Sequence, residues 1–366
     1  MSNRNQLPWM IYGAYGFTGR LIVEEAVRRG HRPILAGRDA ERLNALATPF
    51  GLDVVALSLD DPAALRNAAQ SASLIFNAAG PFTDTGPKII AACLATGTAY
   101  ADISGELDHL RAIEALDEQA RKASIPLLTG AGFGVTLGDC LARHVVERLP
   151  DATSLRLSVA ADNAVETPAV RRTVLEVMSN GGYAIEGGHW VRRRFAHQVW
   201  TVKDGVTDLS FAAAPLGELA ALRASTNVAN IVVGRPMAAR TASYVHLLSP
   251  LIKGALGITP LRNALGRDSG KPPVPAQEPK AGWHSQLWAE ARNARGDRAL
   301  ARIDTGEGYA LTARAAIANV EALSARRLAG AFTPARAFGA RHVLTISGVS
   351  LVDLDVEHQP LARACA

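Results

Sequence analysis

The sequence predicts an α/β protein in which a parallel sheet is followed by a second α+β domain built on a mostly antiparallel sheet. Three observations lead to this prediction. Roughly the first 150 residues alternate short apolar runs with helical segments. After that point, strand-like alternation of polar and apolar residues replaces this pattern. A glycine-rich turn at residues 13–19 stands between the first strand and the first helix.

The elements of the first half follow from local signals. Asp39 and Asp61 precede helices as side-chain caps, with Pro62 at a first helical position. Gly30 and Gly97 end helices. We expect strands at Trp9–Tyr12, Pro33–Ala36, Val54–Leu59, Leu74–Ala79, Ala99–Ile103 and Pro126–Thr129. The expected helices are Thr18–Arg29, Ala40–Thr48, one opened by Asp61 and Pro62, Pro87–Thr96 and Glu106–Ala123.

The second half is predicted in less detail. Gln286–Arg292 and Arg298–Asp304 form a hairpin across a turn. The remaining expected elements are strands at Ser154–Ala160, His197–Val202 and Arg341–Val349, a helix at Thr312–Leu328 and a loop at Gly266–Ala281. The apolar segment Tyr244–Leu265 is a lid, a membrane-surface segment, a dimer contact or a helix pair packed on its own protein. A packed helix pair or a dimer contact is the preferred interpretation.

Composition excludes several classes of protein. The chain has 366 residues, 48% of them hydrophobic, which is ample for a folded core. A net charge of +5 does not by itself indicate nucleic-acid binding, and no nucleic-acid reader motif is present. Three scattered cysteines indicate reduced thiols rather than a metal or disulfide framework. Because residues 1–8 lack a signal-peptide core and no long apolar run exists, we expect a cytoplasmic protein without an integral membrane span.

The glycine-rich turn predicts a dinucleotide site. Gly13 allows the tight turn off the strand, Gly16 lets backbone approach a pyrophosphate, and Gly19 lets the helix pack close to the sheet. The helix N-terminus offers N–H groups and a positive dipole end to the phosphates. With these glycines, we assign the intervening motif residues Tyr15, Phe17 and Thr18 to the cofactor site.

The residue after the second strand indicates which dinucleotide is bound. NAD-binding proteins usually place an acidic residue there, for the ribose 2′-hydroxyl. This chain has Arg38, whose guanidinium can bind a 2′-phosphate and stack on adenine, while Asp39 is better placed as a helix cap. The sequence therefore predicts NADP(H) as cofactor. The alternative role of Arg38 is a surface ion pair with Asp39 or Glu41.

Small residues follow the fourth strand, where the nicotinamide ribose would pass in the crevice of an open α/β sheet. The expected cofactor contacts here are Asn77, Ala79, Gly80, Pro81 and Phe82. The segments 104–106 and 130–134 occupy the matching ends of the next two strands and should line the same crevice.

These residues resemble the saccharopine dehydrogenase-like NADP-binding oxidoreductases, in particular the bacterial branch that includes trans-acting enoyl reductases. The resemblance rests on residues 12–19, 35–43, 77–86 and 92–106, with shorter stretches at 288–290, 308–313 and 333–339. It implies a Rossmann-type dinucleotide domain at 1–135, a substrate and dimerisation domain at 136–310, and a C-terminal segment at 311–366 that returns to the first domain. It also implies NADPH as the reductant.

Two departures from the family pattern stand out. Ser58 and Leu59 replace an aspartate that members commonly place after the third strand, so we assign these two residues to the adenine side. Gly134 stands where many members have an aspartate, and any role of that aspartate cannot be carried over. Asp139 remains, with Thr136 as the expected cap of its helix.

No familiar proton-donor motif is present. The chain lacks a Tyr-x-x-x-Lys pair and a Gly-x-Ser-x-Gly elbow, and its histidines show no metal-ligand spacing, so no metal site is expected. A donor should therefore come from the second half, where the candidates are Tyr309, His189, Tyr183 and His197; we select Tyr309 and His189. Arg192–Arg194 and Ser225–Asn230 are further candidate lining segments.

The sequence thus predicts an NADPH-dependent oxidoreductase that reduces an enoyl-type C=C bond of a small or acyl substrate by hydride transfer. The alternatives are a saccharopine-type imine reductase and a non-catalytic NADP(H)-binding sensor. We expect a homodimer, since symmetric dimers are the commonest oligomers.

Overall fold

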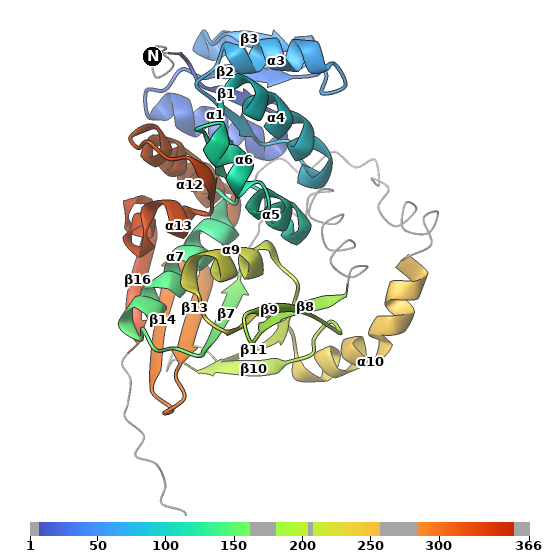
Figure 1. Cartoon of the computed structure of the whole chain (residues 1–366), viewed down its shortest axis with the longest axis vertical. Helices are drawn as coiled ribbons and strands as arrows, with labels where there is room; N and C mark the ends of the chain where they lie inside the picture. Colours follow the sequence, from blue (N-terminus) through green and yellow to red (C-terminus); the bar gives the residue numbers. More distant parts are fainter. Residues whose placement is uncertain (1–6, 162–180, 204–207, 257–283, 355–366) are drawn as a thin grey trace, which may run out of the picture.

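The computed structural model describes residues 7–161, 181–203, 208–256 and 284–354 (Figure 1). Seven parallel strands form the first sheet in the order β15-β6-β5-β4-β1-β2-β3. Its strands are β1 (Met10–Tyr12), β2 (Ile34–Gly37), β3 (Val54–Ala56), β4 (Leu74–Asn77), β5 (Ala99–Asp102), β6 (Pro126–Leu128) and β15 (Gly330–Phe332). Because β1 pairs with both β2 and β4, the strand order reverses at this point, which is where such sheets bind ligands.

Helices cover both faces of this sheet. One face carries α1 (Phe17–Arg28), α2 (Ala40–Ala47) and α12 (Gly308–Ser324). The other carries α3 (Pro62–Gln70), α4 (Phe82–Thr96), α5 (Leu107–Glu114) and α6 (Asp117–Lys122). Successive strand side chains point to opposite faces, so Ile11 packs with the first set and Met10 with the second. Burial on both faces explains the apolar strands, and the predicted Rossmann-type sheet is confirmed.

Helix α7 (Phe133–Arg148) leads from the first sheet to the second. The second sheet runs β10-β11-β12-β7-β13-β14-β16, and all neighbours in it are antiparallel except β12 and β7. Its strands are β7 (Ser154–Ala160), β10 (Val199–Lys203), β11 (Asp208–Ala213), β12 (Asn230–Pro236), β13 (Ser285–Arg292), β14 (Arg298–Thr305) and β16 (Val349–Leu354). The predicted mostly antiparallel sheet and its β13–β14 hairpin are confirmed. The sequence analysis missed β11, β12 and the hairpin of β8 (Gly182–Glu186) and β9 (His189–Arg193).

Helices α7 and α9 (Gly217–Thr226) pack their apolar side chains on the second sheet, where Leu141 and Leu219 join Leu157 and Leu287 in one core. α10 (Ala239–Leu256) lies beside β11. After α12, β15 pairs with β6 in the first sheet, and the chain continues through α13 (Pro334–Phe338) and a 3-10 turn, η3 (Ala340–Thr345). Then β16 pairs with β14 in the second sheet. The expected domain boundaries remain predictions.

Two helices begin earlier than predicted, because carboxylates from elsewhere in the chain or just before the helix cap them. Helix α4 begins at Phe82 rather than Pro87, since the Glu106 carboxylate accepts the N–H groups of Phe82 and Thr83. Helix α12 begins at Gly308 rather than Thr312, since Glu307 caps its first turn. The expected single helix Glu106–Ala123 is two helices, α5 and α6, with a break at residues 115–116.

Two other local predictions were wrong. Residues 341–345, expected in a strand, form part of η3, where His342 is buried and bonds to Asn319 of α12. Thr136 lies inside α7 and does not cap it; its hydroxyl donates to the carbonyl of Gly130.

The apolar segment Tyr244–Leu265 belongs to α10 as far as Leu256; its remainder and the loop Gly266–Ala281 lie outside the described residues. Across the ranges that are described, no helix has both the length and the apolar character needed to cross a membrane.

Asp139 joins three helices at the junction of the two sheets. It is fully buried in α7, and its carboxylate accepts hydrogen bonds from the Ser225 hydroxyl of α9, at 2.5 Å, and the Ala335 N–H of α13, at 2.8 Å. Burial outweighs these hydrogen bonds and raises the pKa of Asp139 to about 6. The folded protein therefore holds this proton more tightly than the unfolded chain does.

This raised pKa predicts a specific pH dependence of stability. As the pH rises from about 4 to about 7, the unfolding free energy of the wild-type protein should fall by about 2 kcal/mol more than that of Asp139→Asn. The sign follows because the folded state binds more protons than the unfolded state between the two pKa values. Denaturant unfolding at a series of pH values measures this difference, with the exposed Asp84→Asn as control. Parallel curves for wild type and Asp139→Asn would contradict the prediction.

Candidate functional site

The turn after β1 is built on close backbone contacts. Gly13 has a φ of +84°, which an L side chain rarely adopts, and its N–H donates to the carbonyl of Ala36. A Cβ on Gly13 would lie 2.8 Å from the Ala79 side chain after β4. A Cβ on Gly19 would lie only 2.2 Å from the Gly13 carbonyl oxygen. Glycine at these two positions therefore lets α1 pack onto the turn and the turn onto β4.

Gly16 plays a different part. It precedes α1 in an extended conformation, and no side chain caps the first turn of the helix. A Cβ on Gly16 would meet only the Gly13 carbonyl oxygen, at 3.2 Å. Phe17 and Thr18 follow it at partly exposed positions. The start of α1 therefore presents uncapped backbone N–H groups beside the switch point, the arrangement that binds phosphates.

Aromatic and cationic side chains border the turn on the β2 side. The Tyr15 ring packs on Gly37, where a Cβ would lie 2.7 Å from the ring, and the Arg42 guanidinium lies 4.5 Å from the ring centre. Arg38 is exposed directly after β2 and makes no hydrogen bond or ion pair within the described ranges. Asp39 caps α2 by accepting the Arg42 N–H, as predicted. The alternative Arg38 ion pairs with Asp39 or Glu41 are thus not formed.

Ser58 and Leu59 follow β3 at the same edge of the sheet. Ser58 is exposed and its hydroxyl accepts the Asp60 N–H, while Leu59 is half-buried. Leu57, just before them, donates its N–H to the Gly37 carbonyl, so this segment runs beside Arg38. These positions suit the adenosine half of a dinucleotide.

The loop after β4 is fixed from within. Asn77 is fully buried, its amide donates to Thr85 and its carbonyl oxygen accepts the Ala79 N–H. It therefore shapes the loop through Ala79, Gly80, Pro81 and Phe82 rather than presenting its own side chain; the Gly80–Pro81 peptide is cis. The Glu106 carboxylate holds the far end of the loop, with both oxygens 2.9 Å from the backbone nitrogens of Phe82 and Thr83.

A buried Asp–His pair lies behind this loop. Asp102, at the end of β5, accepts from His109 at 2.7 Å and from the Ser104 N–H, the Thr129 hydroxyl and the Gly130 N–H. Burial alone would raise the pKa of Asp102, but His109 and the backbone N–H groups lower it. Burial alone would lower the pKa of His109, but the charge of Asp102 raises it. The pair thus ties the loops after β5 and β6 to α5.

The structure brings Tyr309 to the cofactor side and leaves His189 away from it. The Tyr309 ring at the start of α12 packs edge-on against Phe17, with centroids 4.9 Å apart. His189 is exposed at the turn of the β8–β9 hairpin, which bonds to residues 229–230. These residues lie beyond the C-terminal end of α9, whereas Gly217 at its N-terminal end contacts the loop after β5 through the Gly105 carbonyl.

Other candidates from the sequence hold the second domain together. Tyr183 accepts a hydrogen bond from Arg192, and Arg193 pairs with Glu186 across the hairpin. His197 is half-buried before the edge strand β10, and burial lowers its pKa. Within 225–230, Ser225 bonds to Asp139 and Asn230 bonds to the Thr153 carbonyl. None of these side chains meets the glycine-rich turn.

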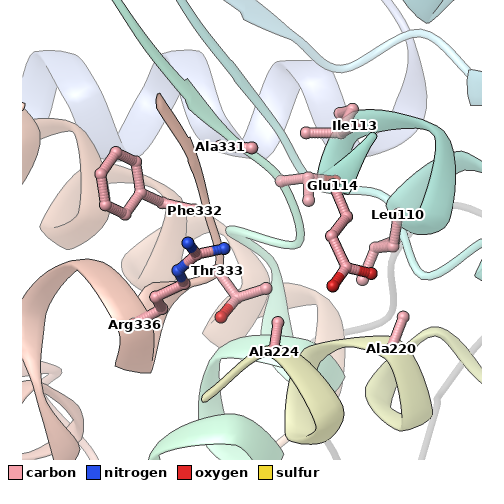
Figure 2. Close-up of a pocket in the computed structure, with 10 residues that line it drawn as sticks. Leu110, Ile113, Glu114, Ala220, Ala224, Ala331, Phe332, Thr333 and Arg336 are labelled. Atoms are coloured by element: carbon pink, nitrogen blue, oxygen red, sulfur yellow. The ribbon is translucent and has the colours of Figure 1, made fainter. Parts of the chain in front are cut away.

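A separate small pocket lies where α5, α9, β15 and α13 meet, with Glu114 and Arg336 at its two sides (Figure 2). Apolar side chains such as Leu110, Ile113 and Ala220 line most of it, and the glycine-rich turn contributes none of its lining. It is therefore distinct from the cofactor crevice. Within the ranges that the structure describes, no three His, Cys, Asp or Glu side chains gather as metal ligands would.

Sequence reasoning placed Glu106 in a segment expected to line the crevice but did not foresee its capping role, and it missed Asp102 and Glu218. Glu106 and Asp102 organise the crevice loops, and Glu218 of α9 is buried against Gly134 at the start of α7. Arg235 of β12 lies 3.7 Å from Glu218. No short motif contains these groups, because each acts on partners far away in the sequence. The acidic residue in Ser104-Gly105-Glu106 was the only local signal.

Comparison with known proteins agrees with this geometry. Residues 9–128 match the family described as saccharopine dehydrogenase NADP binding domain. This match confirms the predicted resemblance and supports NADP(H) as the cofactor. The residues fit it, since the uncapped start of α1 suits the diphosphate and the unpaired Arg38 suits the 2′-phosphate.

Relatives are similar over part of their length. The chain is 30% identical over 189 residues to a trans-acting enoyl reductase of Mycobacterium ulcerans (strain Agy99), covering 50% of this chain and 44% of that protein. It is 32% identical over 157 residues to a trans-acting enoyl reductase of Mycobacterium leprae (strain TN), covering 40% and 38%. The chain thus aligns with less than half the length of these relatives.

Among solved structures, saccharopine dehydrogenase (L-Glu forming) from Saccharomyces cerevisiae has the same fold. Its TM-score is 0.65 at 11% sequence identity, with 95% of this chain and 100% of that chain covered. At this identity the likeness shows the fold alone.

Arg38 should select the phosphorylated cofactor. Arg38→Ala should weaken NADPH binding roughly 10- to 100-fold, because a charge-assisted contact contributes about 1.5–3 kcal/mol, and should leave NADH binding nearly unchanged. Fluorescence titration with each cofactor measures both affinities, and Arg341→Ala is an exposed control. Equal losses for NADPH and NADH would refute this assignment of Arg38.

The glycines should separate into packing and ligand positions. Gly16→Ala should fold with nearly unchanged thermal stability but bind NADPH at least about tenfold more weakly, since one methyl group blocks close approach of the diphosphate. Gly19→Ala should lower the melting temperature, because its Cβ would collide with the Gly13 carbonyl. Thermal melts and NADPH titration test both variants. A Gly16→Ala protein with wild-type affinity would argue against a diphosphate at this turn.

Proposed function

We propose that this chain, whose residues 9–128 match the NADP-binding domain of the saccharopine dehydrogenase family, is an NADPH-dependent oxidoreductase. The observation that carries the proposal is the uncapped N-terminus of α1, placed at the switch point of the sheet with the unpaired Arg38 beside it. When bound, NADPH supplies the hydride. The protein's own residues must hold the cofactor, exclude water and stabilise the substrate.

We further propose that the bond reduced is an enoyl C=C bond of an acyl substrate. The support is the name of the mycobacterial relatives, which share residues with this chain over 40–50% of its length. The substrate would lie between the ends of β5 and β6 and the second sheet, because there the loop at Gly105 and the start of α7 at Gly134 meet α9. An imine reductase and a non-catalytic NADP(H) sensor are the competing functions.

In this proposal Tyr309 contributes to the cofactor site. Its ring packs on Phe17 of the glycine-rich turn, so it helps to fix the start of α1. His189 takes no part in the proposed chemistry, since it lies at the hairpin turn beyond the far end of α9. A homodimer and a cytoplasmic location remain predictions; light scattering and fractionation of cells would test them.

One assay separates the three functions. We expect wild-type protein to oxidise NADPH in the presence of the 2-enoyl thioester crotonyl N-acetylcysteamine and to form the saturated product, followed by absorbance at 340 nm and mass spectrometry. An imine reductase would instead consume NADPH with an α-keto acid and an amine. NADPH binding with no turnover of either class would favour the sensor. Gly16→Ala is the control for cofactor-dependent turnover.

A further inference from the structure

A buried carboxylate sits between the crevice of the first sheet and the second domain. Glu218, in the first turn of α9, has a side chain only 3% exposed. The preceding Gly217 donates its N–H to the Gly105 carbonyl at 3.0 Å, and a Cβ on Gly217 would lie 2.6 Å from that oxygen. Glycine at this position therefore brings the first turn of α9 directly against the loop after β5.

Glycines of α7 make the space for this carboxylate. A Cβ on Gly134 would lie 2.4 Å from Glu218 Oε1, and a Cβ on Gly138 would lie 3.4 Å from its Cγ. The Glu218 side chain thus runs along α7 and ends at Gly134, in the second residue of that helix. Since α7 directly follows β6, the carboxylate lies over the half of the crevice where the nicotinamide is expected.

Arg235 lies beside this carboxylate and retains donors for another ligand. Its guanidinium is 3.7 Å from Glu218 Oε1, beyond hydrogen-bond distance, and the side chain is 38% exposed. Within the described ranges its side chain makes no hydrogen bond. By contrast, Arg223 on α9 is bound to Glu114 at 2.8 Å. Arg235 is therefore held beside Glu218 by charge while its guanidinium N–H groups remain available, which suits binding of a substrate oxygen.

We propose that Arg235 binds the carbonyl oxygen of the acyl substrate and that Glu218 is the residue that positions Arg235. This inference rests on the proposed enoyl reduction and names its charge-stabilising group. The hydride that NADPH supplies when bound forms the new C–H bond at the β-carbon. The C=C π pair becomes a bond between the α-carbon and the carbonyl carbon, and the carbonyl π pair moves onto the oxygen. Arg235 neutralises this charge. A proton from water then adds at the α-carbon, leaving NADP⁺ and the saturated acyl product.

The geometry explains why both residues are needed. A guanidinium that develops its strongest contact as the oxygen becomes negative stabilises the transition state more than the bound substrate. Glu218 restricts where the long Arg235 side chain can lie, and burial strengthens the attraction between their charges. The acidic side chain also suits the N-terminal turn of α9, so removal of Glu218 affects both α9 and Arg235.

The first test measures the role of Arg235 with crotonyl N-acetylcysteamine, a neutral thioester that lacks the phosphates of coenzyme A. Arg235→Met should lower kcat/KM about 100-fold, mainly through kcat, and Arg235→Lys should recover about tenfold of that loss. NADPH affinity should not change. Arg240→Met, an exposed arginine on α10, is the matched control and should behave as wild type. Unchanged kinetics in Arg235→Met would overturn the proposal.

The second test separates positioning from structure. Glu218→Gln should lower kcat about tenfold with little change in KM. Gly134→Ala should do the same while keeping the Glu218 charge, because its methyl group displaces the carboxylate. Thermal melts show whether each variant is folded. If both variants lose only stability and keep wild-type kcat, Glu218 stabilises α9 alone and its positioning role is overturned.

A binding measurement distinguishes failure of this inference from failure of the proposed function. Calorimetry follows the unreactive butyryl N-acetylcysteamine thioester binding to the wild-type protein with NADP⁺. If the wild-type protein turns over the enoyl thioester and Arg235→Met has the same kinetics, enoyl reduction is supported and the role of Arg235 is rejected. Butyryl thioester binding that Arg235→Met weakens and Arg240→Met does not, without wild-type turnover, would keep the site and reject the reaction. Neither turnover nor binding in wild type would reject both.

Discussion

The approach of helix α1 to the turn after β1 is the constraint on which the cofactor crevice depends. No side chain fits between Gly19 and the Gly13 carbonyl, and none fits between Gly13 and Ala79. These contacts fix three neighbouring segments, the ends of β1 and β4 and the start of α1, at backbone distance from one another. The orientation of the uncapped N–H groups, and therefore any grip on a diphosphate, follows from this packing.

The two sheets are coupled by buried polar groups as well as by apolar packing. Asn319 of α12 donates its amide N–H groups to the Ala131 carbonyl and the Thr136 hydroxyl, and its amide oxygen accepts from the Nε2 of His342. Asp139 connects α7 to α9 and α13 in the same region. Because such groups need specific partners when they are buried, they define the relative position of the two halves more sharply than apolar contacts alone would. The relative position of the two halves in turn fixes the shape of the crevice on its substrate side.

The parts of the fold that sequence reasoning could predict depend on neighbours in the chain. Gly13 and Gly19 act within one turn, Asp39 caps the helix that follows it, and the parallel strands are visible as apolar runs. The parts that it missed depend on distant partners. Glu106 starts α4 from 24 residues away, and Asp102 holds Gly130 from 28 residues away. Glu218 was missed for the same reason, because only the packing of α9 on α7 places it against Gly134, where Arg235 of β12 approaches it.

The carboxylate of Glu106 has a consequence for the orientation in which a dinucleotide binds. The starts of α1 and α4 flank the ends of β1 and β4, and either helix dipole would attract an anion. At α4 an internal negative group already occupies the backbone donors of Phe82 and Thr83 and repels another. A diphosphate can therefore bind the free N–H groups at the start of α1, whereas those of Phe82 and Thr83 at the start of α4 already bind Glu106. This asymmetry directs the phosphates toward α1 and leaves the loop before α4 for an uncharged ring.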